Sequence, residues 1–112
     1  MPSKVRINMN LCDNITLVEV AQNEAGNFLV KVDTPCDNVR EFAHGLEELS
    51  MADITDKNEG KVFQKMRSCR MSANCLVPAG VISCAWLEAG MIAKSNAKKN
   101  KNNNVEFLFD QE

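Results

Sequence analysis

The sequence predicts a small α+β domain in two layers, with a mainly antiparallel sheet and helices on one face of it. The first third of the chain alternates apolar and polar residues as strands do, and the following half, to about residue 93, carries apolar residues at helical spacing. A short alternating segment then closes the chain. Strands grouped ahead of helices are typical of this class, here in the order β-β-β-α-α-α-β.

Size and composition indicate one domain over residues 1–112. The chain is 45% hydrophobic, enough to build one core without cross-links. A net charge of -2 gives no basic field that would attract a polyanion, so we expect no nucleic-acid partner. No segment approaches the roughly 18 apolar residues of a membrane helix, and the first residues lack the apolar stretch of a signal peptide. We therefore expect a cytoplasmic protein with no membrane partner.

Three strands are expected in the first third of the chain. Residues 5–9 alternate apolar and polar side chains, the pattern of a half-buried strand, and Asp13 and Asn14 then favour a turn. Residues 15–21 are rich in β-branched side chains, and residues 28–32 alternate again after a polar, glycine-containing turn. We expect these last two strands to pair as a hairpin.

The first helix is expected from about residue 35 to residue 49. Thr34 is a candidate N-cap, Pro35 suits the first helical position, and Asp37 faces the positive end of the helix. Apolar residues then follow helical spacing and form one stripe. The stripe consists of Val39, Phe42, Ala43, Leu46 and Leu49.

Two further helices are expected after a polar loop over residues 50–60. Residues 62–69 suggest the second helix. Residues 79–93 contain a single charge, so the third helix must be buried on most sides. Gly80 and Gly90 weaken this helix, and each marks either a close approach of another backbone or a helix end.

The C-terminal part of the chain divides into a loop and a strand. Residues 94–104 are almost wholly Lys, Asn, Ser and Ala, and we expect a flexible loop there. Residues 105–109 alternate apolar and polar side chains again. They predict the closing strand.

The five cysteines fall into two groups. Without an export signal we expect reduced thiols rather than disulfides. Cys84 lies inside the apolar third helix and is expected to pack as a small hydrophobic residue. The other four lie at element ends or connections, where residues distant in sequence can converge. They are Cys12, Cys36, Cys69 and Cys75.

Thiols at element ends are candidate ligands for a soft metal. Cys36 and Cys75 lie at or near predicted helix N-termini, where the helix dipole favours an anion and lowers the pKa of a thiol. Thiolates suit zinc, copper(I) or an iron–sulfur cluster. The spacing Cys69-x5-Cys75, however, is neither the Cys-x2-Cys of a zinc ribbon nor a ferredoxin run. Spacing alone therefore leaves scattered reduced thiols as the alternative.

Three segments carry a family resemblance. Cys12 follows Asn10-Leu11, Cys36 follows Thr34-Pro35, and the segment from Cys69 to Cys75 leads into Leu76-Val77-Pro78-Ala79. With these segments the chain resembles a family of small prokaryotic proteins of unknown function that is common among anaerobes. The resemblance spans most of residues 4–93 and weakens over residues 94–104. It implies that the four cysteines belong together with Cys84 outside the set, and it implies no reaction.

Three functional hypotheses follow. In the leading one, Cys12, Cys36, Cys69 and Cys75 bind a thiophilic metal ion, such as zinc, or an iron–sulfur cluster, and no substrate chemistry is required. In the second, the chain is a protein-interaction module or homodimer that uses its apolar third helix or an exposed sheet edge, and the cysteines are incidental. The third is a thiol enzyme. It is the least favoured, because a Cys-x-x-Cys motif is absent and His44, the single histidine, is expected at the surface or boundary.

Overall fold

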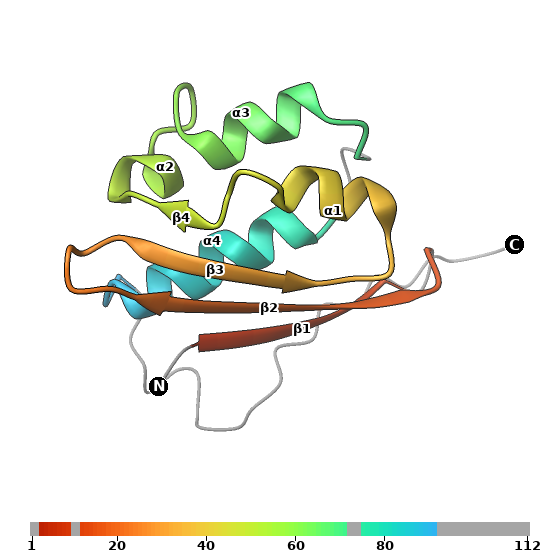
Figure 1. Cartoon of the computed structure of the whole chain (residues 1–112), viewed down its shortest axis with the longest axis horizontal. Helices are drawn as coiled ribbons and strands as arrows, with labels where there is room; N and C mark the ends of the chain where they lie inside the picture. Colours follow the sequence, from red (N-terminus) through yellow and green to blue (C-terminus); the bar gives the residue numbers. More distant parts are fainter. Residues whose placement is uncertain (1–2, 10–11, 72–74, 92–112) are drawn as a thin grey trace, which may run out of the picture.

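The computed structural model describes residues 3–9, 12–71 and 75–91. In this part of the chain, four strands form an antiparallel sheet accompanied by four helices (Figure 1), which confirms the predicted α+β class. The elements are β1 (Ser3–Met9), β2 (Asn14–Gln22), β3 (Phe28–Asp33), α1 (Asp37–Ala43), β4 (Glu48–Leu49), α2 (Met51–Thr55), α3 (Lys61–Ser68) and α4 (Val77–Glu88). The loop predicted over residues 94–104 and the strand predicted over 105–109 lie outside the described residues.

The sheet has the strand order β1-β2-β3-β4, so β1 lies at one edge. The turn predicted at Asp13 is present, and this residue adopts a φ of 54°, in the left-handed region that Asp tolerates better than most residues. Val18 pairs with Val5 on one side and with Val32 on the other. The predicted pairing of the second and third strands is therefore confirmed.

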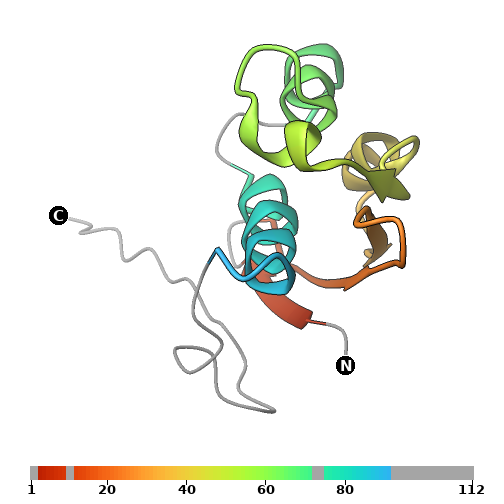
Figure 2. The ribbon, with the colours of Figure 1, turned by 90° about the vertical axis from the view of Figure 1, so that its left-hand side faces the viewer.

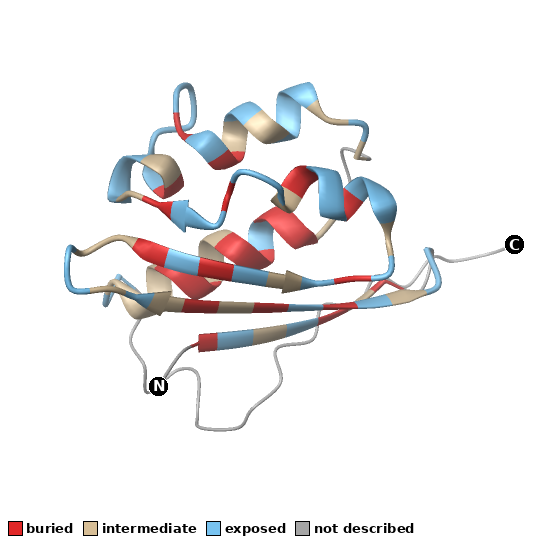
Figure 3. Cartoon of the chain, in the orientation of Figure 1, coloured by how far each residue is buried: buried red, intermediate tan, exposed pale blue. Residues whose placement is uncertain are grey.

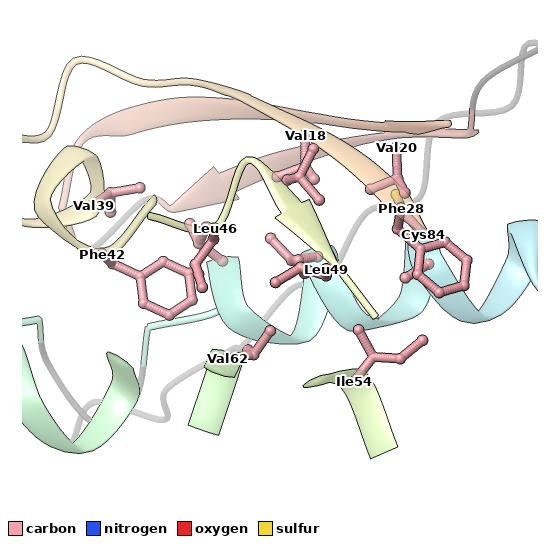
Figure 4. Packing of buried hydrophobic residues seen from close by; sticks show 14 of the residues in the cluster. Val18, Val20, Phe28, Val39, Phe42, Leu46, Leu49, Ile54, Val62 and Cys84 are labelled. Carbon is pink, nitrogen blue, oxygen red and sulfur yellow. The ribbon is translucent and has the colours of Figure 1, made fainter. Parts of the chain in front are cut away.

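The core lies between the sheet and α4. Buried and exposed residues alternate along the strands, as Figure 3 shows, and the buried set on β2 includes Val18 and Val20. Helix α4 packs on β1 and β2, and the pair α2 and α3 lies on its far side (Figure 2). Leu49, Ile54 and Val62 reach this core from β4, α2 and α3 (Figure 4). The third predicted helix is therefore buried, as its composition indicates.

The first predicted helix is shorter than its apolar stripe. Helix α1 ends at Ala43, and the prediction that it continues to residue 49 is wrong. Gly45 adopts a φ of 93°, which a helix does not permit. Leu46 and Leu49 are nevertheless buried, because the chain beyond Gly45 turns back and pairs with β3 as β4. A buried stripe was thus divided between a helix and a strand.

The start of α1 also differs from the prediction. Cys36 is the N-cap residue, and the helix begins at Asp37 rather than at Pro35. Thr34 does not cap the helix. Its hydroxyl instead forms a buried hydrogen bond of 2.8 Å with the hydroxyl of Thr16, because Thr34 still follows β3 and faces β2.

A helix, α2, occupies part of the predicted loop over residues 50–60. It begins with a capping box, in which Ser50 Oγ accepts from the Asp53 N–H and Asp53 Oδ2 accepts from the Ser50 N–H at 2.8 Å. Asp53 Oδ1 also accepts from the Lys61 N–H at the start of α3. Burial raises the pKa of Asp53, but these backbone hydrogen bonds outweigh it and hold the pKa below its ordinary value. One carboxylate therefore joins the starts of two helices.

The two glycines of the third predicted helix mark a helix end and a close approach, although the approach is by a side chain and not by another backbone. Gly90, just past α4, has a φ of 77° and lies at the helix end. A Cβ on Gly80 would lie 2.6 Å from Ile7 Cδ1, so this glycine marks the close approach of a β1 side chain. No helix in the described ranges has the length and apolarity needed to cross a membrane.

We predict that Gly80→Val lowers the free energy of unfolding by about 1–3 kcal/mol, because the new side chain overpacks against buried Ile7. Chemical denaturation followed by circular dichroism measures this loss. Ala79→Val, at an exposed neighbouring position of α4, is the matched control and costs less than about 1 kcal/mol. Equal losses in the two variants would show that the contact between α4 and β1 tolerates added volume.

Candidate functional site

Four cysteines lie at one end of the molecule, which we call the thiol end. The end of β1, the starts of β2 and α1, the end of α3 and the start of α4 all point there (Figure 1). Cys12 is exposed in the β1–β2 connection, Cys36 caps α1, Cys69 ends α3, and Cys75 precedes α4. The predicted positions at element ends are therefore confirmed for all four.

Cys36 is tied to the start of β2 through two threonines. The buried hydroxyls of Thr16 and Thr34 are 2.8 Å apart, and Thr34 Oγ1 accepts a hydrogen bond from the Cys36 N–H at 3.2 Å. Arg40 Nε donates to the Thr34 carbonyl at 3.2 Å and closes the same loop from α1. These contacts fix the Cys36 backbone close to the strand that follows Cys12.

Met9 links Cys12 and Cys75. Its carbonyl accepts a hydrogen bond from the Cys12 N–H at 3.1 Å. The Cys75 thiol contacts the Met9 thioether at an Sγ–Sδ distance of 3.8 Å. The end of β1 thus holds the β1–β2 connection with its backbone and the start of α4 with its side chain.

Cys75 is affected by all three of the other thiols at this end. Burial raises the pKa of Cys75 most, and charges on Cys12, Cys36 and Cys69 raise it further, against a hydrogen bond from the Val77 N–H that lowers it. The lowered pKa predicted for Cys75 is therefore wrong, since burial and like charges outweigh the helix N-terminus. The electrostatic effect agrees with the shared position of the four cysteines.

The four thiols are not gathered into a ready set of metal ligands. Among the described residues, no group of three or more His, Cys, Asp or Glu side chains is arranged to hold a metal ion. Among the described residues, the Cys75 thiol hydrogen-bonds to the Met9 thioether and to no other thiol. Binding a metal with several thiolates would require the thiols to move toward one another.

Cys84 stands apart from the thiol end, as expected. It is buried in the middle of α4 with 1% of its surface exposed. Burial, and to a smaller extent the charge of Glu88, raises the pKa of its thiol to about 12. Cys84 is therefore protonated at neutral pH and packs as a small hydrophobic residue of the core.

An open hollow of about 590 Å³ lies beside the turn between β1 and β2. Its lining includes Asp13 and Pro35, the sequence neighbours of Cys12 and Cys36. This again shows that the β1–β2 and β3–α1 connections are adjacent. Sequence reasoning missed this hollow, and also the role of Met9, because both depend on contacts between side chains from separate elements. The sequence pattern of β1 marks Met9 only as a core position.

His44 does not pair with a thiol at this end. It is exposed at the C-cap of α1, whereas Cys36 is the N-cap of the same helix. The surface position predicted for His44 is confirmed. The geometry therefore provides no histidine base for Cys36.

Residues 3–100 match a family of unknown function, DUF6951. The match covers most of the chain and includes all five cysteines. No curated protein and no solved structure matches the chain.

We predict that iodoacetamide modifies Cys12 first and Cys84 only after unfolding. Cys12 is exposed, whereas Cys84 is buried and its pKa is raised to about 12. Cys75 is expected to react more slowly than Cys12, because its raised pKa leaves little thiolate at pH 7.5. Peptide mass spectrometry after timed alkylation measures the order, and a fast reaction of Cys84 in the folded protein would contradict it.

Proposed function

We propose that this chain, which belongs to the family of unknown function DUF6951, binds a thiophilic metal ion or cluster through Cys12, Cys36, Cys69 and Cys75. The observation that carries the proposal is the placement of four cysteines, from segments up to 63 residues apart, at element ends on one side of the molecule. Zinc, copper(I) and iron–sulfur clusters are the groups that such soft ligands favour.

A bound cation would favour the ionised form of the thiols at the thiol end. Burial is the main cause that raises the pKa of Cys75, and negative charge on the other thiols at this end raises it further. Bound positive charge offsets that negative charge, and metal binding releases the thiol protons.

An interaction module receives less support. The apolar side of α4 is used inside the molecule, where Trp86 Nε1 also donates to the Ile54 carbonyl at 3.1 Å. Exposed Leu17 and Leu29 lie on the outer face of the sheet. Between them, the charged residues Glu19 and Lys31 pair across β2 and β3. Exposed Ile15 and Leu17 are neighbours on this face, but the charged pair separates them from Leu29, so the apolar side chains do not form the continuous patch that marks an interface.

A thiol enzyme is also less well supported. A nucleophilic cysteine needs a substantial fraction of thiolate at neutral pH. The raised pKa of Cys75 works against this, and His44 is at the opposite end of α1 from Cys36. Metal binding remains the function that uses all four cysteines.

We predict that the full chain, purified without oxygen, binds a thiophilic metal in stoichiometric amount. Zinc, copper(I) and reconstituted iron–sulfide are each supplied, and bound metal is measured by elemental analysis after desalting and by absorbance of the charge-transfer bands. Cys36→Ser and Cys75→Ser are expected to reduce binding to the background, because each removes one soft ligand.

Cys84→Ala is the matched control for these two variants. It removes a thiol from the core and leaves the thiol end intact, so bound metal is expected to equal that of the unaltered chain. Circular dichroism verifies that every variant is folded. Equal metal content in Cys75→Ser and in the unaltered chain would overturn the proposed function.

A further inference from the structure

Strand β1 is an open edge of the sheet. Within the described part of the chain it pairs with β2 alone, in an unbroken register from Ser3 to Met9 (Figure 1). The strand contains neither a proline nor a bulge, two of the devices that protect an exposed edge. Alternate N–H and C=O groups of β1 therefore point away from β2, toward the side where a further strand would pair.

The two faces of this edge differ in chemistry. Lys4 and Arg6 are exposed on the outer face of the sheet. Val5 lies on the inner face, beside Gly80 of α4, but it remains partly exposed, whereas its neighbour Ile7 is buried. Side chains on the same face of neighbouring strands contact one another. A strand that matches this edge therefore needs acidic side chains on one face and apolar side chains on the other.

The sequence of residues 105–110, beyond the described ranges, has this pattern. Val105, Phe107 and Phe109 alternate with Glu106, Leu108 and Asp110. Successive side chains of a strand point to opposite faces of its sheet. As a strand, this segment would have one wholly apolar face, and its other face, which we call the acidic face, would carry two carboxylates.

The chain leaves α4 beside the start of β1. Cys75, just before α4, contacts Met9 at the end of the strand, and Ser3 Oγ at the start of the strand donates to Glu88 Oε2 at 2.6 Å. A chain as long as residues 92–104 can span more than about 40 Å, whereas β1 is about 23 Å long. The residues that follow can therefore reach either end of this edge and pair with it in either direction.

We propose that residues 105–109 bind to the free edge of β1 as a further strand of the sheet. The apolar face of this segment then covers Val5 on the side of α4, and the acidic face lies beside Lys4 and Arg6. Buried aromatic side chains and opposite charges on neighbouring strands both stabilise such a pairing. The inference is independent of the proposed metal site, because no cysteine takes part in it.

Amide hydrogen exchange in the full chain, followed residue by residue by NMR, tests the pairing. A paired β1 is expected to protect all of its interior amides, whereas an open edge protects only the alternate amides that bond to β2. Nuclear Overhauser contacts between β1 and residues 105–109 are expected as the direct readout. Alternate β1 amides that exchange as fast as those of an unfolded peptide would overturn the proposal.

Phe107→Asp is expected to release the segment, because it places a charge on the apolar face. The β1 amides that point away from β2 should then exchange at least about tenfold faster, while the amides between β2 and β3 stay protected and show that the domain is folded. Leu108→Asp is the matched control, since it places the same charge one residue along on the acidic face. It is expected to leave the exchange of β1 unchanged, and equal effects of the two variants would overturn the proposal.

Protein concentration separates binding within one chain from binding between two copies. The protection of β1 is expected to be the same in dilute and concentrated samples, with a monomer on size-exclusion chromatography. Protection that appears only together with a dimer would assign the segment to the edge of a second copy. That result would overturn docking within the chain.

Discussion

The arrangement of this protein depends on the close packing of α4 across β1 and β2. Gly80 permits that approach, because a side chain there would collide with Ile7. Val77, Val81, Cys84 and Ala85 then cover the inner face of the two strands and exclude water from it. Burial of apolar surface of this kind is the main source of stability in a small domain. The start of α4 is consequently fixed against the end of β1.

The same packing explains why the cysteines share one end. Each of the four lies where an element begins or ends, and the antiparallel sheet with α4 across it directs those ends the same way (Figure 1). Two local contacts refine the arrangement. The two buried threonine hydroxyls tie Cys36 to β2, and Met9 ties Cys12 and Cys75 to β1. The buried core and the thiol end are therefore two results of one topology.

Much of the fold follows from the periodicity of the sequence, and the exceptions have physical reasons. The alternation in β1, β2 and β3 and the apolar composition of α4 predict those elements, since burial determines both patterns. Leu46 and Leu49 continue a helical stripe by coincidence, and the stripe does not reveal that Gly45 ends the helix. Helix α2 depends on a two-residue capping box, a signal too short to stand out in a polar segment.

Only part of the candidate site could be predicted from the sequence. Positions at element ends identify Cys12, Cys36, Cys69 and Cys75 and exclude Cys84, because a topology of short connections gathers ends. The contact between Met9 and Cys75 and the raised pKa of Cys75 depend instead on tertiary packing, which periodicity does not describe. The helix N-terminus alone predicts a lowered pKa for Cys75, but burial raises the pKa of this thiol instead.

The carboxylate that joins α2 and α3 gives the molecule an acid-labile corner at the end opposite the thiol end (Figure 1). Asp53 accepts backbone hydrogen bonds from both helix starts, and its pKa lies below the ordinary value of 3.8. Its contribution to stability is therefore complete above that value and disappears as the pH falls through the lower pKa of the folded state. Strong acid would therefore weaken the hydrogen bonds that join α2 to α3, whereas the apolar core between α4 and the sheet does not depend on this carboxylate.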